Sequence, residues 1–384
     1  MINIKKVSRY FIIIVLLLSV TGLFASAEAT LDDIYNEQLA ESGAEEIWSD
    51  LPSETKDFMN KIGVDSFKAE SFTGMKPDKV INSLFDLLKE RATGPFRSAG
   101  VLLGVVLLYA LMDGMRQTVK EESISKVFGA ICAITACAAL LVPISGCIRD
   151  VSNAAKSTSV FMFSYVPVFA GIMLASGQAV TSASYQTVVL FAAELISLAA
   201  THFIVPMMTV SLAMGLTGSV TPNMKLDRAS SFINSCCGWL LGLITSVFVG
   251  LLSMQGMVGS AVDTMTGRAI RFSLGAFVPV VGSALGEAYN SVRGCLSLLK
   301  STLGGFGILA TALIMLPPLI ECIIWLLSMS FCIMVAEMFS LDTVASLFKT
   351  AQGVLKTLIG VLSACSMFMI VATAIVTVAG KNAY

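Results

Sequence analysis

The residues best suited to chemistry in this 384-residue chain are single polar side chains inside long apolar stretches. Glu194 and His202 lie in the stretch 187–214, and Ser197 and Thr201 fall on the Glu194 side of a helix. An ionisable group at membrane depth costs about 3 kcal/mol, so it usually faces a partner or a water-filled cavity, as in a proton relay. His202 points roughly 80° away from Glu194 around the helix axis, so we expect no direct pair. The alternative is a glutamate that bonds to a neighbouring helix and a histidine that only packs.

Three further polar residues raise the same question. Glu321 lies inside the apolar stretch 303–335, whereas Gln178 and Glu287 follow two short Val-Pro-Val segments at matching places. Because a glutamine matches a glutamate, the pair favours a shared polar position over a proton site at both places.

Motifs for catalysis or cofactor binding are absent from the sequence. It contains no phosphate-binding loop, dinucleotide fingerprint, HExxH motif or hydrolase triad, and its nine cysteines lack paired CxxC spacing for zinc. We therefore expect no catalytic residue, no cofactor and no metal, and predict that the protein is not an enzyme. The net charge of −1 gives no field for gripping nucleic acid, so we expect no nucleic-acid partner.

Five prolines lie where apolar helices would have to break or bend. Pro167 and Pro279 occupy the two Val-Pro-Val segments, Pro206 lies in the following apolar stretch, and Pro317-Pro318 interrupts 303–335. Broken or re-entrant helices that form a gate would fit this pattern, and so would spans with a proline kink.

The composition indicates that these residues are carried by a polytopic membrane protein. The chain is 55% hydrophobic and 13% charged, against about 25% charged for soluble domains. A spanning helix needs about 20 mostly apolar residues, which predicts an all-α bundle. The candidate spans are 98–115, 127–148, 159–176, 187–214, 235–258, 303–335 and 355–379, with a shorter glycine-rich stretch at 272–286.

The membrane part resembles itself. Residues 165–168 recur as 277–280, and Pro206 recurs as Pro318, both 112 residues later. Three further matches keep the same order: Gln178 with Glu287, Leu226-Asp227 with Leu341-Asp342, and Gly238 with Gly353. We predict an internal duplication of about 110 residues, as in transporters whose ligand path lies between repeats. The predicted repeats cover about 159–258 and 272–379.

Two features bear on topology and association. Lysine and arginine are spread too evenly over the predicted loops for the positive-inside rule to orient the spans. Gly238 and Gly242 have the small-xxx-small spacing that lets helices approach closely in lipid, so we expect bundle packing or a homo-oligomer.

The N-terminus has the features of an export signal. Lys5, Lys6 and Arg9 precede an apolar run at 10–24, and Ala25-Ser26-Ala27 follows. This pattern predicts a signal peptide at 1–27 that is cleaved after Ala27; an uncleaved signal anchor has the same charge pattern.

Residues 28–97 differ from the rest of the chain. They hold 15 acidic and 8 basic residues, a net charge of −7, and their apolar residues recur at helical spacing. Lys76-Pro77-Asp78 is typical of a helix start. Because 70 residues are few for an independent core, we predict an extracytoplasmic helical segment that docks on the 98–384 membrane domain or on a partner. It could also be only a solvated leader.

Three segments of this sequence resemble a known family. YVPVFAGIMLASGQ (165–178), TPNMKLDRASSFI (221–233) and RFSLGAFVPVVGSALGEA (271–288) are similar to stage III sporulation protein AE of endospore-forming Firmicutes. The similarity covers nearly the whole chain and is most specific from about 95 to 380.

The resemblance implies a multi-pass protein of the mother-cell membrane around the forespore. It implies a channel or export-gate subunit of a secretion or feeding complex that is required for sporulation. The implied partners are other stage III sporulation membrane and ring-forming proteins, and a secretion-type ATPase that acts separately. The alternatives are a proton-coupled secondary transporter using Glu194, or a passive membrane scaffold for the complex.

Overall fold

The computed structural model describes residue 35 and residues 38–40, 42–64, 76–116, 122–220, 226–277 and 282–379. Within these residues every regular element is a helix, which confirms the predicted all-α class. The predicted signal peptide at 1–27 and Pro279 lie outside the described residues. The short helices are α3 (Ala44–Ser49) and α4 (Ser53–Ile62). The long ones are α6 (Pro77–Arg116), α7 (Glu122–Ala175), α8 (Ala179–Leu198), the π-helix η2 (Ala199–Ile204), α9 (Val205–Val220), α10 (Leu226–Phe277), α11 (Gly282–Met338) and α12 (Asp342–Ala379).

Six helical stretches are long and apolar enough to cross a membrane, which confirms the predicted polytopic bundle. The sequence predicted seven, and the difference lies in α7. The predicted spans 127–148 and 159–176 both belong to this one helix, so the second is neither a separate span nor re-entrant. The six stretches are Pro77–Leu111, Ile134–Ala175, Ala179–Gly218, Arg228–Ile270, Val292–Met338 and Asp342–Thr377.

These helices are longer than a bilayer requires. Helix α7 has 54 residues and α11 has 57, which at about 1.5 Å per residue corresponds to roughly 80 Å each. The hydrocarbon core of a bilayer is about 30 Å thick. Parts of these helices must therefore lie outside the hydrocarbon.

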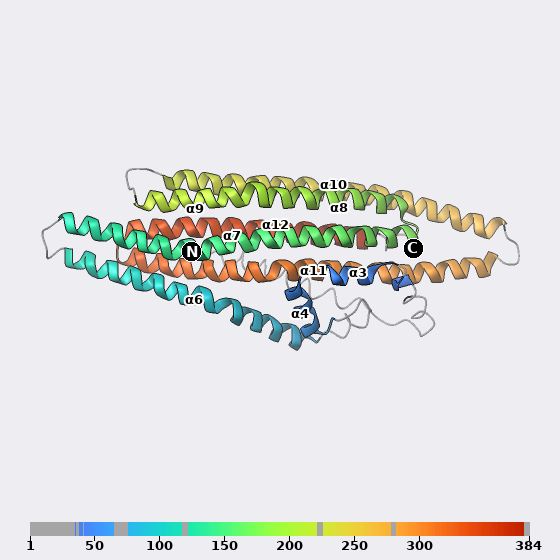
Figure 1. The fold of residues 1–384 in the computed structure, drawn as a ribbon. Coiled ribbons are helices and arrows are strands. Elements are labelled where there is room, and N and C mark those ends of the chain that lie inside the picture. Colours follow the sequence, from blue (N-terminus) through green and yellow to red (C-terminus); the bar gives the residue numbers. More distant parts are fainter. Residues whose placement is uncertain are drawn as a thin grey trace.

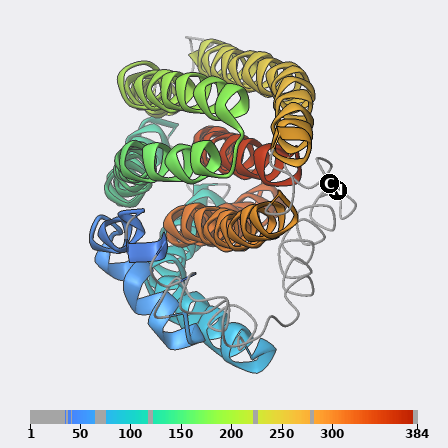
Figure 2. The same ribbon diagram turned by 90° about the vertical axis from the view of Figure 1, so that its right-hand side faces the viewer.

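The long helices run side by side, alternating in direction, and form an elongated bundle of three layers (Figures 1 and 2). One outer layer holds α8, η2, α9 and α10, and α7 and α12 form the middle layer. The other outer layer holds α11 and α6. In their most apolar windows α7 and α11 bury 56% and 50% of the residues, against 22% for α6 and α10, so α7 and α11 form much of the core.

The described part of the N-terminal segment packs on this bundle. Ile47, Met59 and Ile62 of α3 and α4 are buried in the same apolar core as the long helices. The rings of Trp48 and Phe306 have centroids 6.0 Å apart and join α3 to α11.

Helix α6 begins at Pro77, as the sequence predicted, with the proline at a position that needs no N–H partner. It continues through residue 97 without a break. The amphipathic start and the first apolar stretch are thus one helix, and the boundary predicted at 97/98 lies inside it.

The predicted duplication is not tested by this arrangement and stays a prediction. Two of its landmarks begin helices: α10 starts at Leu226 and α12 at Asp342. Pro206 and Pro318 each lie in the long helical stretch that precedes one of these starts.

Candidate functional site

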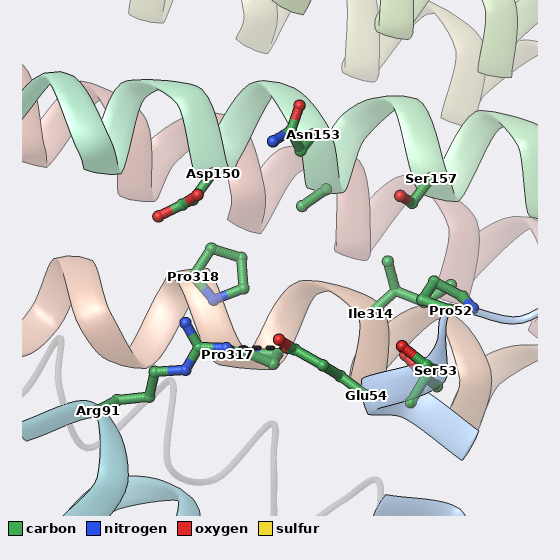
Figure 3. A pocket seen from close by; sticks show the side chains of 12 residues that line it. Pro52, Ser53, Glu54, Arg91, Asp150, Asn153, Ser157, Ile314, Pro317 and Pro318 are labelled. Carbon is green, nitrogen blue, oxygen red and sulfur yellow. Dashed lines mark hydrogen bonds and ion pairs between the residues drawn. The ribbon is translucent and has the colours of Figure 1, made fainter. Parts of the chain in front are cut away.

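A polar cavity of about 330 Å³ lies where α4 meets α6, α7 and α11 (Figure 3). The predicted gate residues Pro317 and Pro318 form part of its wall. The cavity therefore joins the N-terminal segment to the helix that carries the paired prolines. Its lining residues are Pro52, Ser53, Glu54, Thr55, Arg91, Asp150, Asn153, Ala154, Ser157, Ile314, Pro317 and Pro318.

One arginine ties three elements together at this cavity. The Arg91 guanidinium of α6 donates to Glu54 of α4 at 2.9 Å and to Glu321 of α11 at 3.4 Å. Glu321 was predicted from its intramembrane position, and the structure supplies its partner. The Glu54 side chain is 67% exposed, so its pair with Arg91 contributes only about 0–1 kcal/mol. These pairs fix the position of α4 more than they stabilise the fold.

The paired prolines leave free acceptors on α11. Proline has no N–H, so Pro317 and Pro318 cannot donate to the carbonyls of Leu313 and Ile314 one turn earlier. Pro318 and Ile314 are buried and line the cavity. The helix nevertheless continues through both prolines, so α11 is one helix and not two half-helices.

Helix α7 supplies the polar wall opposite the prolines. Asp150, Asn153 and Ser157 follow one another at three and four residues, so they share one face of the helix. In Figure 3 the Asp150 carboxylate extends from α7 toward Pro318. Among the described residues no hydrogen bond or ion pair is formed by this carboxylate.

A second polar cluster is buried at the turn between α7 and α8. Gly177 has φ 82°, a left-handed conformation that suits glycine, and it ends α7 so that Gln178 turns inward. The Lys300 ammonium of α11 donates to Gln178 Oε1 at 2.7 Å, and both side chains are buried. The predicted polar position Gln178 thus has its partner inside the bundle.

The start of α8 is held by a carboxylate from another helix. Asp263 of α10 accepts from the backbone N–H groups of Val180 and Thr181, both at 3.0 Å, and from the Thr181 hydroxyl at 2.6 Å. Asp263 is buried. It satisfies donors that a helix N-terminus leaves free and complements the helix dipole.

The remaining predicted residues do not gather at either cluster. Glu194 and Pro167 are exposed, and the part of the chain that is described gives Glu194 no hydrogen bond or ion pair. His202 is also exposed, and its Nδ1 lies 2.8 Å from the Thr201 hydroxyl, without contact to Glu194. Glu287 lies in α11, but its side chain is outside the description.

Pro206 accompanies a widened turn. Just before it, the Val205 N–H donates to the carbonyl of Ala200, five residues earlier, in the π-helix η2. Because Pro206 cannot donate to its own i−4 carbonyl, the regular ladder is interrupted here. The sequence predicted a break at this proline, and the structure places a π-helical turn there.

The charged members of both clusters were not predicted. Lys300 is one of the lysines and arginines that the sequence pattern places in loops, but α11 is continuous through it; α7 is likewise continuous through Arg149 and Lys156, which belong to neither cluster. Arg91 and Asp263 were not singled out. A usable signal was present, because the buried residues keep helical spacing through these charged stretches.

The bundle is that of an α-helical, multi-pass type of membrane protein, with six candidate spans and a polar cavity at a proline pair. Comparison with known proteins makes this class specific. The profile of the family described as stage III sporulation protein AE matches residues 63–380, and the chain belongs to this family. The stage III sporulation protein AE of Bacillus subtilis (strain 168) is 23% identical over 295 residues, 74% of either chain. No solved structure matches the chain.

Proposed function

We propose that this protein is a channel or export-gate subunit of the complex that connects mother cell and forespore during sporulation. The observation that carries the proposal is the polar cavity beside Pro317 and Pro318. A gate needs a polar opening next to a helix that can change its bend, and a proline pair provides both free carbonyls and a bend point. Family membership supports the process.

We infer the partners from the family membership and from the proposed role as a gate subunit. Other stage III sporulation membrane and ring-forming proteins would contact the N-terminal segment, which we propose to be extracytoplasmic. A separate secretion-type ATPase would supply energy, since we propose no catalytic activity and no cofactor for this chain. We place it in the mother-cell membrane around the forespore, where a homo-oligomer could surround a shared path.

The gate proposal is tested by replacing Pro317 and Pro318 with residues that have a backbone N–H. In a sporulating host whose own gene is replaced, the double variant Pro317→Ala/Pro318→Ala restores both N–H donors. We expect normal protein level and normal co-purification with the complex, but a sporulation frequency reduced at least tenfold. The control is Pro143→Ala in α7, a proline that does not line the cavity. Wild-type sporulation by the double variant would favour a passive scaffold.

A proton-coupled transporter using Glu194 is the competing function. A proton site normally faces a cavity or a partner, whereas Glu194 is exposed and does not line the cavity at the proline pair. We expect Glu194→Gln to assemble and sporulate normally. Loss of sporulation with an assembled complex would support the transporter instead.

A further inference from the structure

The cavity at the proline pair contains more hydrogen-bond acceptors than donors. Glu54 and Asp150 contribute carboxylates, Asn153 lies at the margin, and the Glu321 carboxylate is 3.4 Å from the Arg91 guanidinium. Among the described residues Arg91 is the single cation in the lining, and it already pairs with two carboxylates, Glu54 and Glu321. The Asp150 carboxylate is left without a counter-charge among the described residues.

Two independent features of the wall add to this excess of acceptors. The carbonyl of Ile314, a lining residue, lacks its usual donor because Pro318 has no N–H. Thr55 is 3% exposed, lines the cavity, and its hydroxyl has no hydrogen-bond partner in the described part of the chain. The Thr55 oxygen is not one of the fully buried side-chain atoms, so it is open to the cavity and can accept a hydrogen bond from a ligand or from water.

We propose that this cavity binds the basic side chain of a lysine or arginine presented by a partner protein. An ammonium or guanidinium group carries several N–H donors and a positive charge, which are what the wall lacks. The Asp150 carboxylate is its ion-pair partner. The Thr55 hydroxyl accepts a second hydrogen bond, and Asn153 lies at the exposed margin on the same helix as Asp150.

The cavity is open to a side chain that comes from outside the bundle. Glu54 and Asn153 are exposed at its margin, while Thr55 and Pro318 are buried at its base. A long side chain can therefore place its charged end beside Asp150 while its backbone stays outside. The biological meaning of this binding rests on the proposed function, but the binding itself can be measured without it.

The test uses the purified full-length chain in detergent micelles and fluorescently labelled nine-residue peptides. One peptide carries a single central arginine and the other carries citrulline, which has the same shape without the charge. We expect the arginine peptide to bind about tenfold more tightly or better, because hydrogen bonds to charged groups are the strong ones. Asp150→Asn should remove the preference, and Asp86→Asn, an exposed carboxylate of α6 outside the cavity, should keep it.

A variant that is expected to bind the peptide more tightly is included because misfolding could only weaken binding. Asn153→Asp adds a second carboxylate to the same exposed face, and we expect it to bind the arginine peptide more tightly than wild type. Equal binding of the two peptides, or a preference that survives Asp150→Asn, would overturn the proposal. Displacement of the peptide by Mg²⁺ or spermidine at equal concentration would show a site for free cations and would also overturn it.

This result separates the inference from the proposed function. If the peptide preference is absent while Pro317→Ala/Pro318→Ala still blocks sporulation, only the inference fails. If the preference is present while the proline variant sporulates normally, the gate is wrong and the recognition site stands.

Discussion

Replacing the carboxylate that caps α8 should destabilise the whole bundle. In Asp263→Asn the side chain keeps its shape and one oxygen, but it loses its charge and replaces an acceptor by a donor. That donor would face either the Val180 N–H, which now donates to Oδ1 at 3.0 Å, or the Thr181 N–H and hydroxyl, which both donate to Oδ2. In the second orientation the Thr181 hydroxyl would lose a partner at 2.6 Å.

The magnitude follows from these three bonds and from the buried lysine nearby. A capping residue contributes about 0.5–2 kcal/mol, and a hydrogen bond to a charged group about 1.5–3 kcal/mol. Asp263 also supplies negative charge near Lys300, which is 3% exposed. Because the contributions are not additive, we expect a loss of roughly 3 kcal/mol for Asp263→Asn.

Unfolding is induced by adding sodium dodecyl sulfate to the protein in mild detergent, and circular dichroism monitors the loss of helix. The control Asp86→Asn removes an exposed carboxylate from α6 and should change the free energy of unfolding by about 0.5 kcal/mol or less. A double-mutant cycle with Lys300→Met should give a coupling of about 1–3 kcal/mol. If Asp263→Asn matches Asp86→Asn, Asp263 does not hold α8; if the coupling is absent, Asp263 does not stabilise the charge of Lys300.

Three further predictions concern packing and docking. Arg91→Gln should release α4, since it removes the contacts to Glu54 and Glu321; we expect faster proteolytic cleavage within 42–64 and a stability change of only about 1 kcal/mol, while Arg97→Gln, an exposed arginine without a role in the cavity, should leave cleavage unchanged. Gly307→Ala should cost about 1–3 kcal/mol in the same unfolding assay because its methyl group would overlap the Tyr165 ring, whereas Gly305→Ala, two residues away with open space around it, should be neutral or stabilising; equal effects would contradict the packing. Trp48→Ala should weaken the attachment of α3 by about 1 kcal/mol through loss of the ring contact with Phe306, and slower or unchanged cleavage near α3 would argue against that contact.

The helical class and most of the spans could be predicted from the sequence, but the merging of two spans into α7 could not be predicted from hydrophobicity alone. Residues 149–158 contain enough polar side chains to suggest a loop. In the structure Val151, Ala154, Ala155 and Thr158 of this stretch are buried, at helical spacing. The helix continues because one face stays apolar or small, while Arg149 and Lys156 are exposed. Periodicity was therefore the better guide here, and mean hydropathy the worse one.

The candidate site was predictable only in part, because a sequence shows which side chains need partners but not where the partners lie. Glu321 was expected to face a partner or a wet cavity and Gln178 to occupy a polar position; their partners are Arg91, 230 residues away in the chain, and Lys300, 122 residues away. No local spacing links such residues, since helix packing alone brings them together. Pro317 and Pro318 were expected to interrupt a helix, but the polar wall that α7 builds opposite them depends on the same packing.

Glu194 shows that an ionisable residue in an apolar stretch need not face a partner inside the bundle. By position it resembles Glu321, since both lie in apolar helical stretches, yet Glu321 is 22% exposed beside an arginine and Glu194 is exposed without one. An apolar stretch does not show which side of its helix faces the bundle. Near Glu194 the buried residues are Ala192, Ala193 and Ile196, so the bundle lies on their side of the helix. A carboxylate on the opposite side must be wet, protonated or covered by another chain in the assembled complex. The effect of Glu194→Gln on sporulation therefore tests what surrounds this subunit, whereas the effect of Pro317→Ala/Pro318→Ala tests the subunit itself.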